Sequence, residues 1–130
     1  MTSPPTPQPR GGFGDLGRLG ERLALAYLEA HGHILVEANV RRREGEIDLV
    51  TLDGDTLVFV EVKLRRSARL GGAIQALTRT KQRRMAVLAE AYAADHPELP
   101  RGQRIDLVAI DLGPGGVVAN LQHIVSAVEG

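Results

Sequence analysis

The sequence predicts one α/β domain in which helices flank a mixed central sheet. The chain has 130 residues, of which 43% are apolar and very few aromatic, so it can form one aliphatic core. Apolar residues recur at helical spacing in two long segments and alternate at strand spacing in several short ones. These segments follow in the order helix, three strands, helix, and one or two strands, which is typical of an α/β domain.

The N-terminal residues 1–12 are rich in proline and glycine without periodicity, which predicts a disordered tail before a single domain at residues 13–130. The tail has no apolar segment of the kind found in secretory signals. No stretch approaches the roughly 20 apolar residues that span a membrane. The absence of cysteine suits a reducing compartment. We therefore expect a cytoplasmic protein without a membrane partner.

The first helix is expected from about Asp15 to Ala30, with Asp15 as its N-cap and Gly32 as its stop signal. Its apolar stripe consists of Leu16, Leu19, Leu23 and Tyr27. The second helix is expected from about Ile74 to Ala94, after a basic loop that contains two glycines, and His96-Pro97 ends it.

Strands are expected at residues 33–40, 46–52, 56–63 and 103–111, with residues 117–124 as a candidate edge strand. An Asp-Gly pair between the second and third strands is a hairpin signal. Because the second helix connects the third strand to the fourth, those two strands should run parallel. The sheet is therefore expected to be mixed.

Acidic and basic residues alternate with apolar ones in the expected hairpin. Since side chains alternate across a strand, Glu46 and Asp48 should share one face, and Ile47 and Leu49 the other. Glu61 and Lys63 should share a face of the next strand in the same way.

The loop sets the register of this hairpin, and two registers are open. A loop at Asp53-Gly54 would place Asp48 diagonal to Glu61, whereas a loop at Gly54-Asp55 would place the two acids directly opposite each other. The Cβ atoms would be about 7–8 Å apart in the first case and about 5 Å in the second. Both separations suit two carboxylates that share one cation.

Opposed carboxylates repel each other unless a positive group lies between them. Mg²⁺ or Mn²⁺ fits such a pair, because hard cations prefer oxygen ligands and retain bound water. This pattern predicts a metal-dependent phosphodiesterase, in which Lys63 orients or deprotonates the attacking water or stabilises the charge of the transition state. Glu21, at the rim of the apolar stripe of the first helix, can reach the same site. A solvated ladder of Glu and Lys is the alternative.

Charge is balanced overall, with 16 basic and 16 acidic residues, but it is not evenly distributed. Between residues 41 and 84, eleven basic residues outnumber six acidic ones. A basic field around a carboxylate cluster suits a polyanionic substrate, although a solvated surface of uneven charge would look the same. The candidate nucleic-acid contacts are Arg41, Arg42, Arg43, Lys81, Arg83 and Arg84. The four histidines show no metal-ligand spacing, and Asp106 is not expected in the catalytic set.

Asp48 with Glu61-x-Lys63 resembles the signature of the PD-(D/E)xK nuclease superfamily. A longer ordered set resembles the YraN family, which is uncharacterised and endonuclease-like: Gly17, Gly20, Glu21, Ala24, Tyr27, Leu28, Asn39, residues 45–49 and 58–63, Lys81 and residues 105–106. The resemblance covers about residues 14–124. Two departures concern Ile47, where the superfamily has proline, and the Leu70-Gly71-Gly72 loop, where an aromatic residue and Gly-x-Pro are expected.

The resemblance implies a restriction endonuclease-like αβββαβ core with Asp48, Glu61 and Glu21 as metal ligands, and with Lys63 completing the catalytic set. We therefore expect a Mg²⁺- or Mn²⁺-dependent DNA endonuclease, acting on branched or repair intermediates. The alternative is a non-catalytic nucleic-acid-binding or complex-assembly module on the same fold. Cutting a four-way junction would require two active sites and hence a homodimer, for which the sequence shows no diagnostic interface.

Overall fold

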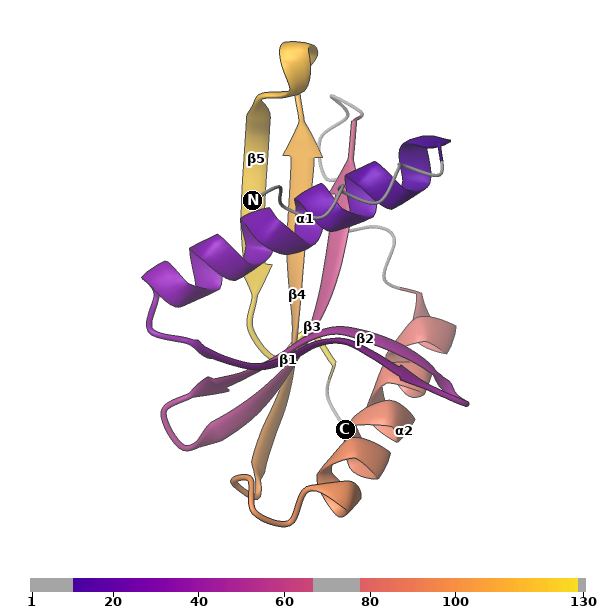
Figure 1. Cartoon of the computed structure of the whole chain (residues 1–130), viewed down its shortest axis with the longest axis vertical. Helices are drawn as coiled ribbons and strands as arrows, with labels where there is room; N and C mark the ends of the chain where they lie inside the picture. Colours follow the sequence, from indigo (N-terminus) through magenta and orange to yellow (C-terminus); the bar gives the residue numbers. More distant parts are fainter. Residues whose placement is uncertain (1–10, 67–77, 129–130) are drawn as a thin grey trace, which may run out of the picture.

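The structure, a computed structural model, describes residues 11–66 and 78–128, and the side chains of residues 16–66 and 78–128. Within these ranges it contains two α-helices and five β-strands (Figure 1). In chain order they are α1 (Gly11–Ala30), β1 (Ile34–Arg42), β2 (Gly45–Asp53), β3 (Thr56–Arg65), α2 (Arg79–Asp95), β4 (Gly102–Leu112) and β5 (Val118–Ile124). The expected order is confirmed, and the candidate edge strand is present as β5.

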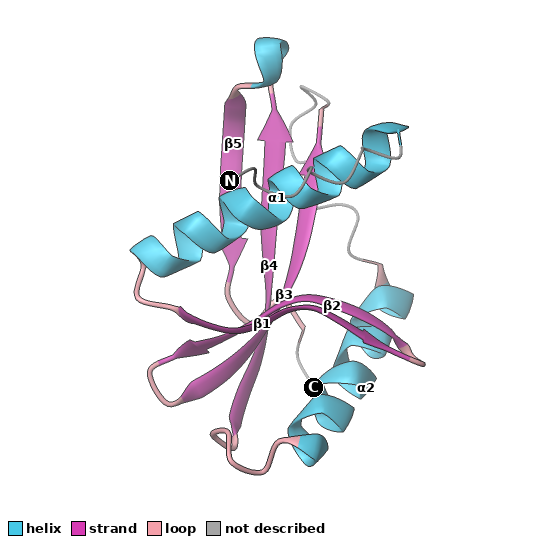
Figure 2. Ribbon diagram, viewed as in Figure 1, coloured by secondary structure: helices cyan, strands magenta, loops and turns pink. Residues whose placement is uncertain are grey.

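The five strands form one mixed sheet in the order β1-β2-β3-β4-β5. All neighbours are antiparallel except β3 and β4, which are parallel. Since α2 lies between these two strands in the sequence, the predicted parallel crossover is confirmed. Figure 2 shows α1 crossing in front of β3, β4 and β5, while α2 lies apart from it, beside the β1–β2 hairpin.

Each helix covers a different aliphatic core. The core under α1 contains Ala24, Leu28, Leu49, Val58, Val60, Val108 and Ile110. The core under α2 contains Val40, Ile47, Val50, Leu57, Phe59, Met85, Leu88, Ala89, Tyr92 and Ile105. Alternate residues of β3 thus supply both cores, which fixes the strand's register. Because Glu61 and Lys63 continue the alternation of Leu57 and Phe59, they belong to the α2 face.

The β2–β3 hairpin has a two-residue loop at Gly54-Asp55, because Asp53 pairs with Thr56. Gly54 has a φ of 60°, a left-handed conformation that glycine adopts easily. Of the two registers that the sequence left open, this is the one that brings Asp48 opposite Glu61. The described pairs end one step earlier, at Leu49 and Val60.

Beyond that pair, β2 leaves β3 and continues beside β1 toward α2 (Figure 1). Ile47 packs in the core under α2, whereas Leu49 packs in the core under α1. The expectation that these two residues share a face is therefore wrong. Strict alternation holds for a straight strand, but here the strand bends where its neighbour on one side ends.

Both helices begin elsewhere than the sequence indicated. α1 starts at Gly11, so Asp15 lies inside it and is not its N-cap, and residues 11–12 belong to the helix rather than to the tail. α2 starts at Arg79 behind Thr78, whose hydroxyl accepts a hydrogen bond from the Lys81 N–H at 3.2 Å. Capping is a local signal worth only about 1 kcal/mol, so packing and competing caps override it. The rest of the tail, residues 74–77 and the glycine loop lie outside the described residues.

Neither described helix has both the length and the apolar character needed to cross a membrane.

A buried charged network on the α1 side holds β2, β4 and β5 together. Asp106 is fully buried and accepts hydrogen bonds from Arg104 at 2.9 and 3.0 Å, from the Ser126 N–H at 3.0 Å and from His123 at 2.7 Å. Arg104 also contacts Asp53 at 3.1 Å. Burial raises the pKa of Asp106, but these hydrogen bonds lower it by more, so the net pKa is below its usual value. The Asp106 carboxylate is thus occupied by hydrogen bonds that hold the fold together.

We predict that Asp106→Asn lowers the free energy of unfolding by about 2–4 kcal/mol, because it leaves Arg104 buried with a weaker partner. Since the folded pKa of Asp106 is depressed, its stabilising effect is present above about pH 4 and is lost as the pH falls further. Urea unfolding at pH 7 measures the change. Asp55→Asn, in the exposed hairpin loop, is the control and should change stability by less than about 0.5 kcal/mol. Equal effects of the two substitutions would contradict the assignment.

Candidate functional site

The splaying of β2 from β3 opens a pocket of about 360 Å³ beside the first turns of α2. Its lining residues are Gly45, Glu46, Asp48, Glu61, Val62, Lys63, Lys81, Arg84, Met85 and Leu88. Three of the four residues that the sequence proposed as catalytic, Asp48, Glu61 and Lys63, therefore share one pocket. Two of the predicted phosphate contacts, Lys81 and Arg84, join them from α2.

Asp48 is fixed by the backbone of the neighbouring strand. The Val62 N–H donates a hydrogen bond to Asp48 Oδ2 at 2.7 Å. Burial, followed by the charge of Glu61, raises the pKa of Asp48 to about 7, although the Val62 hydrogen bond opposes this rise. Asp48 therefore ionises less readily than an exposed aspartate, because both burial and the neighbouring Glu61 disfavour its negative charge.

Lys63 lies between the acids and α2. Its Nζ is 3.3 Å from Glu61 Oε1, and both side chains are largely buried. Burial lowers the pKa of Lys63, but a hydrogen bond with Lys81 and the charge of Glu61 raise it by more, so the net pKa is above its usual value. The same hydrogen bond, together with burial, lowers the pKa of Lys81. The Glu61 carboxylate thus stabilises the positive charge of the Lys63 ammonium.

Glu21 approaches the site from α1 but does not line the pocket. Its side chain is hydrogen-bonded to Asn39 of β1. Burial raises its pKa, the Asn39 hydrogen bond lowers it, and the charge of Glu46 raises it, with a net increase. Its charge also contributes to the raised pKa of Asp48, so the two carboxylates lie within electrostatic reach.

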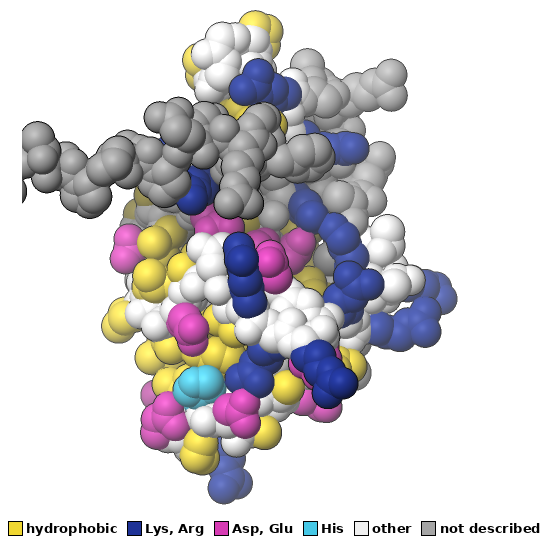
Figure 3. Space-filling model, turned by 45° about the vertical axis from the view of Figure 1, so that its right-hand side comes forward, with side chains coloured by type: hydrophobic (Ala, Val, Ile, Leu, Met, Phe, Trp, Pro, Cys, Tyr) yellow, Lys and Arg dark blue, Asp and Glu magenta, His cyan; other side chains and the backbone are white. Residues whose placement is uncertain are grey.

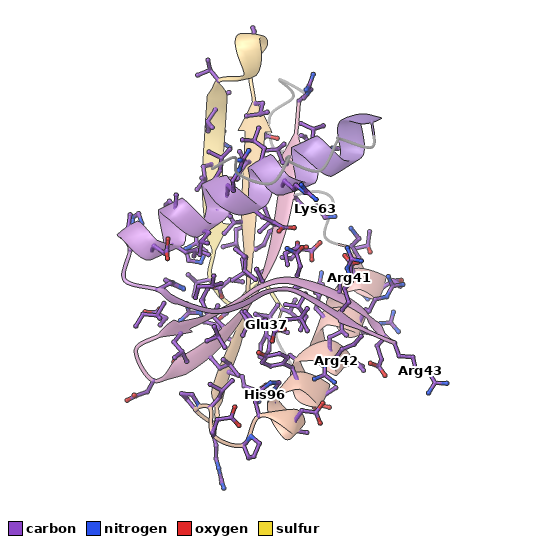
Figure 4. All side chains as sticks on the ribbon, viewed as in Figure 1. Glu37, Arg41, Arg42, Arg43, Lys63 and His96 are labelled. Atoms are coloured by element: carbon purple, nitrogen blue, oxygen red, sulfur yellow. The ribbon has the colours of Figure 1, made fainter. Side chains whose placement is uncertain are left out.

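The predicted basic contacts divide into two groups. Arg41, Arg43, Arg83 and Arg84 are exposed. Arg41 pairs with Glu46 at 3.2 Å on the rim of the pocket, and Arg43 lies in the turn between β1 and β2 (Figure 4). Figure 3 shows Lys and Arg side chains flanking a group of carboxylates on this face of the molecule. Of these four arginines, Arg84 lines the pocket and Arg41 contacts the lining residue Glu46.

Arg42 differs from the prediction, because its guanidinium faces α2. It contacts Asp95 at 2.7 Å and lies 5.6 Å from the centre of the Tyr92 ring. Tyr92 in turn donates a hydrogen bond to Glu37 at 2.8 Å and stacks on His96. Figure 4 labels Glu37, His96 and Arg42. Since neighbouring residues of a strand point to opposite sides, Arg41 and Arg42 of β1 cannot both face one substrate. Arg42 joins β1 to α2.

The donor set fits a hard divalent cation, held by two carboxylates. Mg²⁺ is commonly bound through one or two carboxylates and retains several waters. Asp48 and Glu61 supply such a pair, and the raised pKa of Asp48 indicates negative charge that a cation would neutralise. Across residues 11–66 and 78–128, however, no three His, Cys, Asp or Glu side chains are grouped closely enough to hold a metal together. A third protein ligand from Glu21 is thus not in place.

Sequence reasoning missed the residues that shape the pocket without reacting. Gly45 has a φ of 146°, and a Cβ there would meet Arg84 Cδ at 3.1 Å. Met85 and Leu88 provide an apolar side to the pocket. The contact of Asn39 with Glu21 was also missed, although an asparagine within a β-branched strand is a signal for unusual backbone conformation. Such contacts join distant segments and have no local pattern.

The fold and the pocket define a class of small α/β proteins that hold an acidic pair and two lysines where a hairpin splays from a mixed sheet. Within this class, the chain belongs to the uncharacterised protein family UPF0102, which residues 20–110 match. This confirms the resemblance to the YraN family. The matched segment includes Glu21, Asp48, Glu61 and Lys63.

Similar proteins cover most of the chain. A UPF0102 protein of Symbiobacterium thermophilum is 46% identical over 101 residues, which is 78% of this chain and 86% of that protein. One of Renibacterium salmoninarum is 46% identical over 110 residues, covering 85% and 92%. One of Chloroflexus aurantiacus is 40% identical over 126 residues, covering 95% and 97%.

We predict that Asp48→Asn stabilises the metal-free protein at neutral pH. When folding raises the pKa of a carboxyl, the protein loses stability as the pH rises, because the carboxyl ionises less readily in the folded state than in the unfolded state. The variant should gain on the order of 1–3 kcal/mol above about pH 7, and the gain should shrink steadily between pH 7 and pH 4. Urea unfolding in EDTA at several pH values provides the measurement. Glu46→Gln, on the same strand but exposed, serves as the control. A less stable Asp48→Asn variant at pH 8 would refute this electrostatic account.

Proposed function

We propose that this protein is a divalent-metal-dependent nuclease that hydrolyses phosphodiester bonds in nucleic acid, with DNA as the expected substrate. The observation that carries the proposal is the single pocket that contains Asp48, Glu61 and Lys63 together with Lys81 and Arg84. Acidic groups that bind a cation and basic groups that bind phosphate are the two components that such a reaction requires.

The roles of the residues follow from their contacts. Asp48 and Glu61 would hold Mg²⁺ or Mn²⁺, which supplies a more acidic bound water and polarises the phosphate. The Val62 N–H keeps the Asp48 carboxylate in place. Lys63 Nζ lies 3.3 Å from Glu61 Oε1, so its ammonium is placed to orient water and to stabilise the developing phosphate charge.

The start of α2 supports a phosphate-binding role. Its first turn contains no acidic residue, but Arg79 and Lys81 lie there. The positive end of the helix dipole disfavours cations at this position, so they lower the helix stability unless an anion binds. Backbone N–H groups at a helix N-terminus also attract phosphate. A negatively charged backbone passing the pocket would meet both groups.

The alternative is a module that binds nucleic acid without cutting it. Two observations favour it: Glu61 is paired with Lys63, and the described residues contain no three-ligand metal group. In that case the pocket carboxylates would be structural, and binding would depend on salt but not on Mg²⁺. Asp48 favours the nuclease, because it adds a second carboxylate to the pocket beside Glu61 and is held there by the Val62 N–H and not by a cation of the protein.

We predict metal-dependent cleavage that requires the pocket. Labelled branched, single-stranded and duplex DNA, and single-stranded RNA, are incubated with the protein in Mg²⁺, Mn²⁺ or EDTA. Asp48→Asn and Lys63→Ala should each reduce the cleavage rate by roughly 10³-fold or more, since each removes charge that acts in the transition state. Glu46→Gln, an exposed acid on the pocket rim, should retain most of the activity. Cleavage by Asp48→Asn at the wild-type rate would eliminate this site, and salt-sensitive binding without any cleavage would favour the binding module.

We also predict that the arginines separate by function. Arg43→Ala and Arg83→Ala should weaken binding of a 20-nucleotide DNA and lower the slope of log affinity against log salt by about 0.7–0.9 each, as expected when one phosphate contact is lost. Arg42→Ala should instead leave the slope unchanged and lower the free energy of unfolding by about 1–2 kcal/mol, because it removes the Asp95 and Tyr92 contacts. Fluorescence anisotropy at several salt concentrations, with urea unfolding, distinguishes these outcomes. A reduced salt slope for Arg42→Ala would contradict the division.

A further inference from the structure

Gly45 lies at the end of the β1–β2 hairpin that packs beside α2 (Figure 1). It is the first residue of β2 and pairs with Arg42, the last residue of β1. Its φ of 146° lies in a region that residues with a side chain rarely adopt. Backbone conformations of this kind concentrate at functional sites, where the surrounding contacts maintain them.

The missing side chain of Gly45 leaves room for two residues of α2. A Cβ at this position would lie 3.1 Å from Arg84 Cδ, 3.7 Å from Arg84 Cγ and 3.4 Å from Leu88 Cδ1. Arg84 and Leu88 are four residues apart on α2, so they lie on the same side of the helix. Leu88 is buried in the core under α2, whereas Arg84 is exposed. The buried leucine thus holds the helix against the turn, and the carbon stem of the arginine lies across the glycine.

The Arg84 side chain lines the candidate pocket together with Gly45 and Glu46. Long basic side chains commonly pack their carbon stem on the protein while the charged end stays in water. Within residues 16–66 and 78–128, the Arg84 guanidinium forms no salt bridge, although carboxylates line the same pocket. Its charge is therefore available to an anion from outside the protein.

A phosphate group suits an arginine that is held in this way. The planar guanidinium binds two phosphate oxygens through paired hydrogen bonds, so its value as a ligand depends on its orientation. A stem already held by the protein also loses less freedom when the phosphate binds. Lys63 and Lys81 add positive charge in the same pocket. The space at Gly45 thus orients the pocket residue whose binding depends most on direction.

We propose that Gly45 is a positioning residue that directs the Arg84 guanidinium toward a phosphate of the bound nucleic acid. This role rests on the proposed function for the nature of the ligand, but it requires neither metal binding nor cleavage. Alanine at position 45 would displace the end of Arg84 before it moved Leu88, because an exposed side chain shifts more easily than one packed in a core.

The first test is a double-mutant cycle that uses Gly45→Ala and Arg84→Ala. Gly54→Ala is the matched control, because Gly54 also has a positive φ, of 60°, but a Cβ there meets nothing within 4 Å. A labelled four-way junction and a labelled 20-nucleotide strand are the probes, and the one that the wild type binds more tightly is used. Fluorescence anisotropy in EDTA gives the slope of log affinity against log salt, and circular dichroism checks that each variant is folded.

We expect Arg84→Ala to lower this slope by about 0.7–0.9, as when one phosphate contact is lost. Gly45→Ala should lower it by at least half as much, and the double variant no more than Arg84→Ala alone. Gly54→Ala should bind like the wild type. A wild-type slope in folded Gly45→Ala overturns the inference. A further loss of about 0.7–0.9 in the double variant also overturns it, because Gly45 would then act independently of Arg84.

The second test uses the unaltered protein and decides the inference if Gly45→Ala does not fold. Arg83 is the internal comparison, because it is the neighbouring exposed arginine of α2 and does not line the pocket. The ¹H–¹⁵N nuclear Overhauser effect of the two Nε–H groups reports the mobility of each side chain. The groups are assigned with Arg83→Ala and Arg84→Ala. We expect the Arg84 Nε–H to be the more rigid of the two, and equal mobility would overturn the inference.

The outcomes separate the role of Gly45 from the proposed function. If the wild type binds DNA without cleaving it in Mg²⁺ or Mn²⁺, and the salt slopes change as expected, the role of Gly45 stands and the nuclease falls. If the wild type cleaves DNA but Gly45→Ala keeps the wild-type slope, the nuclease stands and the role of Gly45 falls. If the wild type binds neither probe, both are overturned.

Discussion

The hydrogen bond from the Val62 N–H to Asp48 determines the geometry of the whole site. Within the sheet, β2 and β3 satisfy each other's backbone groups, but beyond Leu49 and Val60 the two strands separate. A strand that leaves its neighbour exposes backbone donors, and these require partners. Here a carboxylate supplies the partner, so the strands can separate without an unpaired Val62 N–H. The same bond orients Asp48 into the pocket that the separation creates.

The charges of the pocket are balanced between the sheet and α2. β2 and β3 contribute Asp48 and Glu61 together with Lys63, while α2 contributes Lys81 and Arg84. The acids alone would repel one another, and the cations alone would destabilise the helix N-terminus. Their closeness offsets part of both costs, but burial and the charge of Glu61 still raise the pKa of Asp48. A bound cation and a phosphate would complete it with opposite charges on the two sides.

Arg42, Asn39 and the bend of β2 show where strand periodicity stops predicting the structure. Alternation correctly placed Glu61 and Lys63 on one face, because β3 stays paired with β4 along its whole length. It did not place Ile47, because β2 bends once β3 has separated from it. It did not identify the special conformation of Asn39, and the run of three arginines concealed that Arg42 belongs to the α2 packing. In each case a contact between distant segments overrides a local rule.

The sequence by itself determined the order of the helices and strands, the parallel crossover and the shared position of Glu61 and Lys63. These depend on local periodicity and on turn chemistry, which neighbouring residues encode. Only the tertiary structure decided the hairpin register, the pocket, the arrival of Lys81 and Arg84, and the contact between Asn39 and Glu21. These depend on how far one element bends or approaches another. That is set by the packing of two cores on opposite faces of the sheet, and no short stretch of sequence contains both sides of such a contact.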